Sequence, residues 1–144
     1  MTLKGRAAAI ISITVLCLVS IYGKAQDTAI DFLRYAVEAT EKKDYAGAIA
    51  LCDRSIALDK RNELAFYHRA YNRFLLGDFK GAIEDTTKSI ELNDQIADTY
   101  LLRAEANLKI GARFSAISDY NRARRLDGSI TVAHIAQNLF NAIF

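Results

Sequence analysis

Apolar and small residues recur at spacings of three and four along most of the chain. Phe66, Ala70 and Phe74 show this spacing, which is typical of one face of an α-helix. Gly77 and Asp78 then interrupt it: glycine adopts the positive φ that closes a helix, and aspartate caps the next one. The pattern predicts three antiparallel helix pairs, 28–42 with 45–58, 63–76 with 79–92, and 97–110 with 113–126.

The whole pattern repeats every 34 residues. Small residues on both helices of a pair let the two backbones approach closely, and an aromatic side chain fills the space beside them. Because no single pair buries its apolar face, the pairs are expected to stack. The recurring packing positions are Phe32, Phe66 and Tyr100; Ala36, Ala70 and Ala104; and Ala48, Ala82 and Ala116.

This combination of period, small-residue columns and turn glycine resembles the tetratricopeptide repeat (TPR) family. The three units are 29–62, 63–96 and 97–130. The resemblance implies an all-α fold, an α-solenoid of three antiparallel helix pairs (a TPR superhelix). The chain departs from the family at the usual proline of each unit's end and at the large residue near the end of each first helix. The residues that replace them are Lys60, Asp94 and Gly128, and Ala39, Arg73 and Asn107.

Residues 130–143 are predicted to form a capping helix that closes the stack. One face is apolar and the other polar, as in a helix that covers a core on one side only. The apolar face carries Val132, Ile135, Ala136, Leu139, Phe140 and Ile143, and the polar face carries His134, Gln137, Asn138 and Asn141.

Residues 1–25 have the layout of a signal peptide: two basic residues, the uncharged segment 7–22, and Gly23-Lys24-Ala25 as the cleavage site. The mature domain is then 26–144, exported to the periplasm or secreted, with a bacterial source favoured. The alternative is an uncleaved membrane anchor through residues 7–22. This segment spans only about 24 Å as a helix, short of a hydrocarbon core of about 30 Å, which favours cleavage.

Composition adds little that is specific. The chain has 144 residues, of which 51% are hydrophobic and 25% charged, and its net charge is +2. Without the three bases of residues 1–25, 16 bases face 17 acids, so the mature net charge is −1. A near-neutral chain gives no support to nucleic-acid binding, and two cysteines do not make a disulfide scaffold.

The sequence shows no constellation for catalysis. His68 and His134 are the only histidines and lie in different units, so no metal site is predicted. There is no nucleophile elbow and no glycine-rich phosphate loop, so we expect no enzyme activity, no cofactor and no small-molecule substrate. Cys52 occupies a packing column and is expected to be a core residue, with a reactive or intermolecular thiol as the alternative.

Arg69 and Arg103 occupy equivalent positions in their units, as do Asp85 and Asp119. Arginine on a first helix with aspartate on a second helix predicts a repeated internal ion pair. Asp85 is expected to pair either with Arg69 or with Arg103 of the next unit. The alternative is that these residues recognise a ligand.

The resemblance also implies that the first helices of the pairs line a concave face. Tyrosine and aliphatic residues dominate its positions, which suits a peptide groove with tyrosine anchors and a polar rim. The alternative is that these side chains pack against neighbouring helices of a tightly wound stack. The candidates for partner binding are Leu33, Val37, Tyr67, His68, Tyr71, Leu101, Leu102 and Glu105, with Arg34, Leu64 and Asp98 beside them.

Some family members hold the C-terminal carboxylate of chaperone tails with lysine, arginine and asparagine. The corresponding positions here are Leu33, Val37, His68, Asp98 and Leu102. A carboxylate clamp needs cations, so this activity is expected to be absent. The sequence therefore predicts a non-enzymatic protein–protein interaction module, with another protein or peptide as partner. The alternative is a tethered or self-associating scaffold component of a cell-envelope assembly, with no free-peptide groove.

Overall fold

The computed structural model describes residues 27–131, 133 and 135. Every regular element in this part of the chain is helical, which confirms the all-α prediction. The predicted helix ends lie within one residue of the observed ones. The helices are α2 (Ala29–Glu41), α3 (Tyr45–Leu58), α4 (Glu63–Leu75), α5 (Phe79–Leu92), α6 (Ala97–Lys109) and α7 (Arg113–Leu126).

Two sequence predictions fall wholly or mostly on other residues. The signal segment 1–25 lies outside the described residues. Of the predicted capping helix 130–143, Ile130 and Thr131 are described and are not helical, so the helix does not begin at 130. Ala133 and the buried Ile135 are helical, whereas Val132, His134 and 136–143 are not described. Ile135 packs with Ala104, Ala116 and Tyr120 of the last repeat. Among the described helices, none has the length and apolar character needed to cross a membrane.

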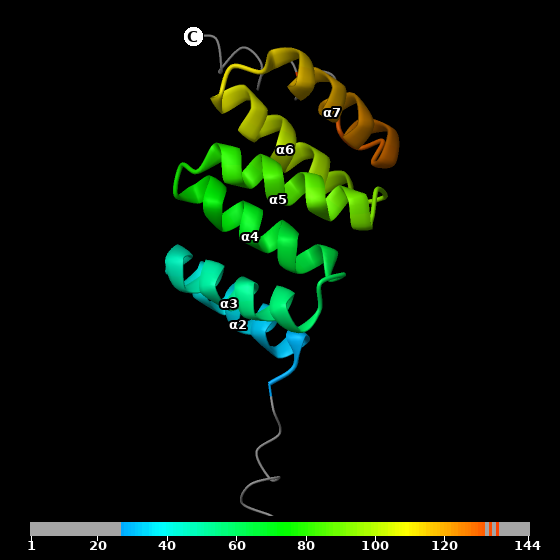
Figure 1. Cartoon of the computed structure of the whole chain (residues 1–144). Coiled ribbons are helices and arrows are strands. Elements are labelled where there is room, and N and C mark those ends of the chain that lie inside the picture. The colour runs from blue at the N-terminus through cyan, green and yellow to red at the C-terminus, as the bar shows by residue number, and fades with distance from the viewer. Residues whose placement is uncertain (1–26, 132, 134, 136–144) are drawn as a thin grey trace, which may run out of the picture.

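The six helices form a stack of three pairs (Figure 1). Within each pair the helices pack along their length, and each second helix also packs against the first helix of the next pair. The first helices contact one another, α2 with α4 and α4 with α6. They therefore form an inner layer of α2, α4 and α6, while α3, α5 and α7 form the outer layer. This arrangement is the helical solenoid that the repeat pattern predicts.

The small-residue columns lie where the helices of a pair approach each other. All six alanines of these columns, Ala36, Ala48, Ala70, Ala82, Ala104 and Ala116, have no exposed surface. The aromatic column lies beside them: Phe66 and Tyr100 are buried, and Phe32 is half-buried. Because these sites are closed on all sides, a larger side chain in an alanine column is expected to force the helices of the pair apart.

The turn inside each pair uses the left-handed backbone region at the same repeat position. Gly77 has φ 83° and Gly111 has φ 79°, and the equivalent Lys43 has φ 62°. Aspartate then caps the second helix in two of the pairs: Asp44 and Asp78 each accept a hydrogen bond of 2.9 Å from the backbone N–H three residues on. The first pair thus keeps the turn of its neighbours, although lysine, unlike glycine, is strained at positive φ.

We therefore expect Lys43→Gly to raise the free energy of unfolding by about 0.5–1 kcal/mol, because glycine adopts positive φ without a steric penalty. Urea unfolding followed by circular dichroism measures the change. Lys42→Gly is the matched control: Lys42 has an ordinary φ of −79°, so glycine there is expected to destabilise. Equal losses in the two variants would contradict the assignment of strain to Lys43.

Candidate protein-interaction surface

The inner layer presents most of the predicted partner-binding residues on its three helices. Leu33 and Val37 lie on α2, Tyr67, His68 and Tyr71 on α4, and Leu101 and Glu105 on α6. All seven are partly or fully exposed. Tyr71 is 38% exposed, and Leu64, one turn before His68, is 43% exposed. An apolar row therefore crosses the three first helices.

Leu102 is a correction to that set. It is only 6% exposed and packs in a core cluster with Ala70, Ala82 and Ala106. On α6, residues four apart share a face, so Leu101 and Glu105 point one way while Leu102 and Ala106 point toward the preceding repeat. Leu102 therefore holds two repeats together and is closed to a partner.

The centre of the inner layer is aromatic and bordered by carboxylates. Tyr67 packs beside the core cluster, and its ring meets the His68 ring edge-on with 5.3 Å between centroids. Burial raises the pKa of Tyr67, and the nearby carboxylates of Asp98 and Glu105 raise it further. Burial lowers the pKa of His68, so its ring favours the neutral form. The tyrosine hydroxyl thus lies in a negative field that α6 supplies.

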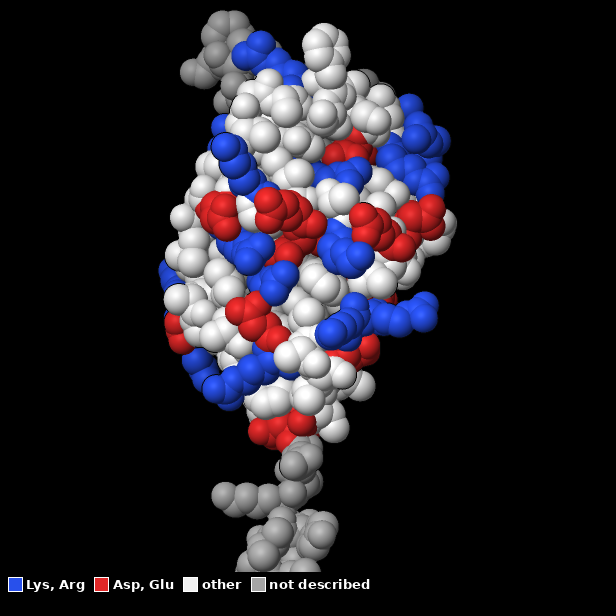
Figure 2. Space-filling model, viewed as in Figure 1, with Lys and Arg blue, Asp and Glu red and all other residues white. Residues whose placement is uncertain are grey.

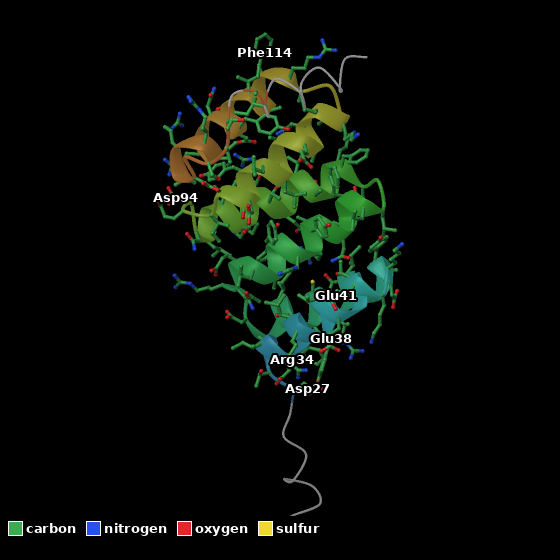
Figure 3. The ribbon with its side chains drawn as sticks, turned by 180° about the vertical axis from the view of Figure 1, so that it is seen from behind. Asp27, Arg34, Glu38, Glu41, Asp94 and Phe114 are labelled. Atoms are coloured by element: carbon green, nitrogen blue, oxygen red, sulfur yellow. The ribbon has the colours of Figure 1, made fainter. Side chains whose placement is uncertain are left out.

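The α2 part of this surface carries one cation between two acids. Arg34 Nη2 lies 3.3 Å from Asp31 Oδ1, and Arg34 Nη1 lies 3.4 Å from Glu38 Oε1. Figure 3 shows Arg34 and Glu38 on the same helix, seen from behind the view of Figure 1. With Asp98 and Glu105 on α6, carboxylates outnumber cations among these residues. The candidate surface is therefore apolar at its centre and acidic at its border.

The repeated arginines and aspartates form ion pairs within their own repeats. Arg69 donates to Asp85 through Nε at 2.9 Å and Nη2 at 2.6 Å. Arg103 donates to Asp119 with the same geometry, at 2.9 and 2.7 Å. The structure thus pairs Asp85 with Arg69 of its own unit. These forked contacts join the first and second helix of a repeat.

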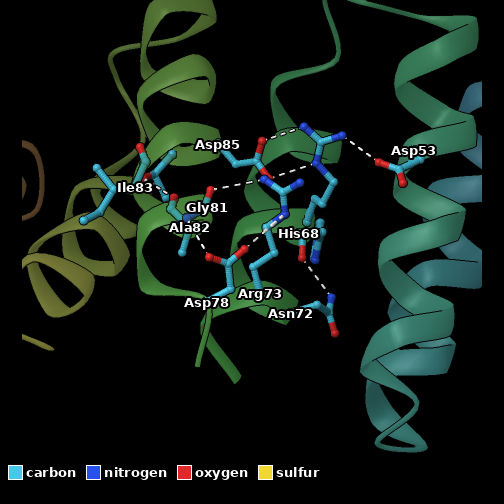
Figure 4. Close-up of polar contacts among 11 residues, drawn as sticks. Asp53, His68, Asn72, Arg73, Asp78, Gly81, Ala82, Ile83 and Asp85 are labelled. Carbon is cyan, nitrogen blue, oxygen red and sulfur yellow. Dashed lines mark hydrogen bonds and ion pairs between the residues drawn. The ribbon is translucent and has the colours of Figure 1, made fainter. Parts of the chain in front are cut away.

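Each arginine also reaches back to the preceding repeat. Arg69 Nη1 donates to Asp53 Oδ1 on α3 at 2.6 Å, and Arg103 Nη1 donates to Thr87 Oγ1 on α5 at 3.1 Å. Figure 4 shows the carboxylates of Asp53 and Asp85 facing this group of contacts from two helices. The Arg69 guanidinium therefore joins α3, α4 and α5. Its hydrogen bond to Asp85 is the main cause that raises the pKa of Arg69.

Arg73 and Asn107 complete these contacts. In the sequence they stand out only as departures from the family pattern. Arg73 Nη1 lies 2.9 Å from Asp85 Oδ2 (Figure 4), and the equivalent Asn107 donates to Asp119 Oδ2 at 3.4 Å. Both stand where the family carries a large residue. The sequence does contain an indication of this role. The two residues are 34 positions apart, and both are polar at a repeat position that usually carries a packing side chain.

A buried amide joins the first two repeats. Asn72 has no exposed surface; its Oδ1 accepts from Thr40 Oγ1 at 2.9 Å and its Nδ2 donates to the His68 carbonyl at 2.8 Å. The contact fixes α4 against α2 beneath the candidate surface. Sequence reasoning did not select it, because neither residue recurs in the other repeats.

Cys52 is buried without exposed surface and is a free thiol. Burial raises the pKa of its thiol to about 12. Within residues 27–131, 133 and 135, no three His, Cys, Asp or Glu side chains come together in a way that would hold a metal ion. The surroundings of Cys52 are those of a packing residue.

We expect Cys52 in the native full chain to resist alkylation by iodoacetamide at pH 7.5, because the reactive thiolate is scarce and shielded. Mass spectrometry of the Cys52 peptide, before and after unfolding in urea, checks this and separates it from Cys17. Complete labelling before unfolding would show that the thiol is accessible and reactive.

Comparison with known proteins identifies the fold. No protein-family model matches the chain. Among solved structures, the first TPR of Spaghetti (RPAP3) bound to the HSP90 peptide SRMEEVD superposes with a TM-score of 0.74 at 21% identity, over 81% of this chain and 90% of that one. The TPR2B domain of yeast Sti1 in complex with pHsp70 gives 0.73 at 23% identity, over 80% and 95%. The type III secretion translocator chaperone SycD of Yersinia enterocolitica gives 0.73 at 17% identity, over 83% and 94%.

Sequence relatives are longer proteins. Tetratricopeptide repeat protein 36 of Xenopus tropicalis is 40% identical over 65 residues, which is 45% of this chain and 32% of that protein. The DnaJ homolog subfamily C member 7 of Homo sapiens is 29% identical over 86 residues, which is 60% of this chain and 17% of that protein. The chain thus spans a third or less of the length of these curated relatives. Together the structural likenesses show that this chain has the tetratricopeptide-repeat fold.

Proposed function

We propose that this chain is a non-enzymatic interaction module that binds a segment of another protein on its inner layer. The observation that carries the proposal is the apolar row across α2, α4 and α6. Leu33, Val37, Tyr67, Tyr71 and Leu101 all keep exposed surface there. Tyrosines with partly exposed rings serve well as anchors, since they bury a large area at a low cost in conformational entropy.

The structural relatives support a protein or peptide as the partner. The first and second TPRs of Spaghetti are each bound to the HSP90 peptide SRMEEVD. The TPR2B domain of Sti1 is in a complex with pHsp70. The same fold thus serves peptide recognition in these proteins, and we extend that general class of partner to this chain.

The charges of the inner layer disfavour an acidic peptide as the partner. Of the positions that match the family's carboxylate clamp, Asp98 is acidic, Leu33 and Val37 are aliphatic, and His68 favours the neutral form. An acidic segment would be repelled by the carboxylate of Asp98 on α6. We therefore propose an apolar segment with a lysine or arginine, whose charge lies between the Tyr67 ring and the carboxylate of Asp98.

We also propose that the domain acts outside the cytoplasm. The support is the order of basic, apolar and small residues in positions 1–25. N-terminal sequencing of the native protein tests this: cleavage gives Gln26 as the first residue. Met1 would favour the tethered alternative, in which the stack is a scaffold held at the membrane.

Site-specific crosslinking tests the inner-layer proposal. A photoreactive amino acid at Leu64, which is 43% exposed on the inner helix α4, is expected to trap a discrete partner in the cells that make this protein. The matched control is the same group at Leu58, which is 59% exposed on the outer helix α3. Mass spectrometry then identifies the partner segment. Equal trapping from the two positions, or trapping from Leu58 alone, would contradict the proposal.

A further inference from the structure

A cleft of about 550 Å³ lies between α5 and α7 of the outer layer, with part of the inner helix α6 in its lining. Thr87 of α5 lines it, together with Arg103 and Asn107 of α6 and with Phe114, Ser115 and Ser118 of α7. The repeat symmetry allows this cleft to be compared, position by position, with the junction of α3 and α5 one unit earlier.

At the earlier junction, a carboxylate occupies the outer edge of the arginine. Arg69 Nη1 binds the carboxylate of Asp53 at 2.6 Å. One unit later, Arg103 Nη1 meets only the neutral hydroxyl of Thr87 at 3.1 Å. The other contacts of the two guanidinium groups are the same in both repeats. The later junction therefore has a neutral hydroxyl where the earlier one has a carboxylate, and it also has the neutral Asn107 where the earlier one has Arg73.

Shorter side chains keep the later junction open. Asp53 and Arg73 are replaced, 34 residues on, by Thr87 and Asn107. Glu84 of α5 is likewise replaced by Ser118 of α7. The wall of the cleft is then formed by the hydroxyls of Thr87, Ser115 and Ser118, each able to donate a hydrogen bond to an anion.

The rim of the cleft is apolar at one end and lies on a basic helix. Phe114 is 91% exposed and points away from the stack (Figure 3), so its ring is accessible to an apolar group of a partner. Helix α7 carries Arg113, Arg122, Arg124 and Arg125 against a single acid, Asp119. Figure 2 shows basic side chains gathered over the end of α7.

We propose that this cleft binds an acidic side chain in an extended segment of a partner protein. The partner carboxylate takes the place at Arg103 that Asp53 takes at Arg69. It accepts hydrogen bonds from Arg103 Nη1, whose present partner is the Thr87 hydroxyl, and from the hydroxyls of Thr87 and Ser118. An apolar residue beside that acid covers Phe114, and the exposed arginines of α7 attract the rest of the acidic segment.

The carboxylate of Asp119, which also lines the cleft, does not prevent an acidic side chain from binding there. Both of its carboxylate oxygens already accept hydrogen bonds, from Arg103 and from Asn107. Asp85 is bound by the two arginines Arg69 and Arg73, and the carboxylate of Asp53 lies at the far edge of the Arg69 guanidinium. Arg69 thus binds two carboxylates while Arg73 adds a second cation, whereas at Arg103 the additional positive charge comes from the arginines of α7.

The test uses the full chain labelled with ¹⁵N and two blocked peptides, acetyl-Gly-Phe-Asp-Phe-Gly-amide and its twin with Asn for Asp. We expect the acidic peptide to shift the Arg103 Nε–Hε and Ser118 amide signals saturably, with an affinity about 10-fold or more above that of the twin. Equal affinities of the two peptides would overturn the proposal.

Two substitutions locate the binding. Thr87→Asp places a carboxylate of the chain itself where Asp53 lies in the earlier repeat. It is therefore expected to raise the unfolding midpoint and to abolish the peptide-induced shifts. Thr87→Asn is the matched control, which leaves the midpoint low and the binding measurable. Phe114→Ala, at a fully accessible site, is expected to weaken the acidic peptide several-fold. Unchanged binding in both Thr87→Asp and Phe114→Ala would overturn the proposal. Substitutions on the inner layer leave these shifts unaltered, so the two surfaces are tested separately.

Discussion

Asp85→Ala is expected to lower the free energy of unfolding by about 3–5 kcal/mol, the usual result of removing one partner from a buried ion pair. The Asp85 side chain is 4% exposed and meets both Arg69 and Arg73. Without it, two guanidinium groups that are largely shielded from water lose their main counter-charge. Because Arg69 also links α3 to α4 and α5, the loss affects both the packing within the second repeat and its junction with the first. Urea unfolding followed by circular dichroism measures the effect.

Asp53→Ala is the matched control for this prediction. Asp53 binds the same guanidinium at 2.6 Å, but its side chain is 54% exposed. Water replaces an exposed carboxylate readily, so the expected loss is about 1 kcal/mol or less. If Asp85→Ala left the unfolding transition unchanged and instead abolished partner binding, the aspartate would be a recognition residue and its structural assignment would be wrong.

The double substitution of Tyr67 and Tyr71 by alanine is expected to weaken partner binding by about 100-fold or more, since each anchor of an interface commonly contributes 2 kcal/mol or more. Tyr67 lies at the centre of the inner layer and packs beside the core cluster, while Tyr71 is 38% exposed. Isothermal titration calorimetry with the crosslinked partner segment measures the change.

The double substitution by phenylalanine separates contact from folding. It keeps both rings and removes only the hydroxyls, so it is expected to retain most of the affinity. Circular dichroism confirms that the alanine variant is still folded under the conditions of the titration, because Tyr67 also contributes to packing. Retained binding in the folded alanine variant would refute the role of the tyrosines as anchors.

The sequence was sufficient to predict the helices because its signals are local. Apolar residues at spacings of three and four recur in all three units, a turn glycine marks the second and third, and an aspartate cap marks the first and second. Lys43 is instructive: it breaks the turn pattern locally, and yet the structure gives it the φ of its glycine equivalents. The packing of the first pair decides the backbone there.

The surfaces were harder to predict because they depend on small rotations and on side-chain length. One residue turns a helix by about 100°, which is enough to leave Leu101 partly exposed, packed against the last repeat's core cluster, while Leu102 is buried between two repeats. Arg73 appeared in the sequence only as the loss of a packing residue, since its partner Asp85 lies on the other helix of the repeat. The outer cleft arises from replacements on α5, α6 and α7 together, and no single position reveals it.

The central claim is that the partner lies on the inner layer, across α2, α4 and α6. Chemical-shift mapping of the ¹⁵N-labelled full chain with the crosslinked partner segment tests it most directly. The predicted result is that the largest changes fall on residues around Val37, Tyr71 and Leu101, one on each inner helix. Changes confined to α3, α5 and α7 would contradict the claim.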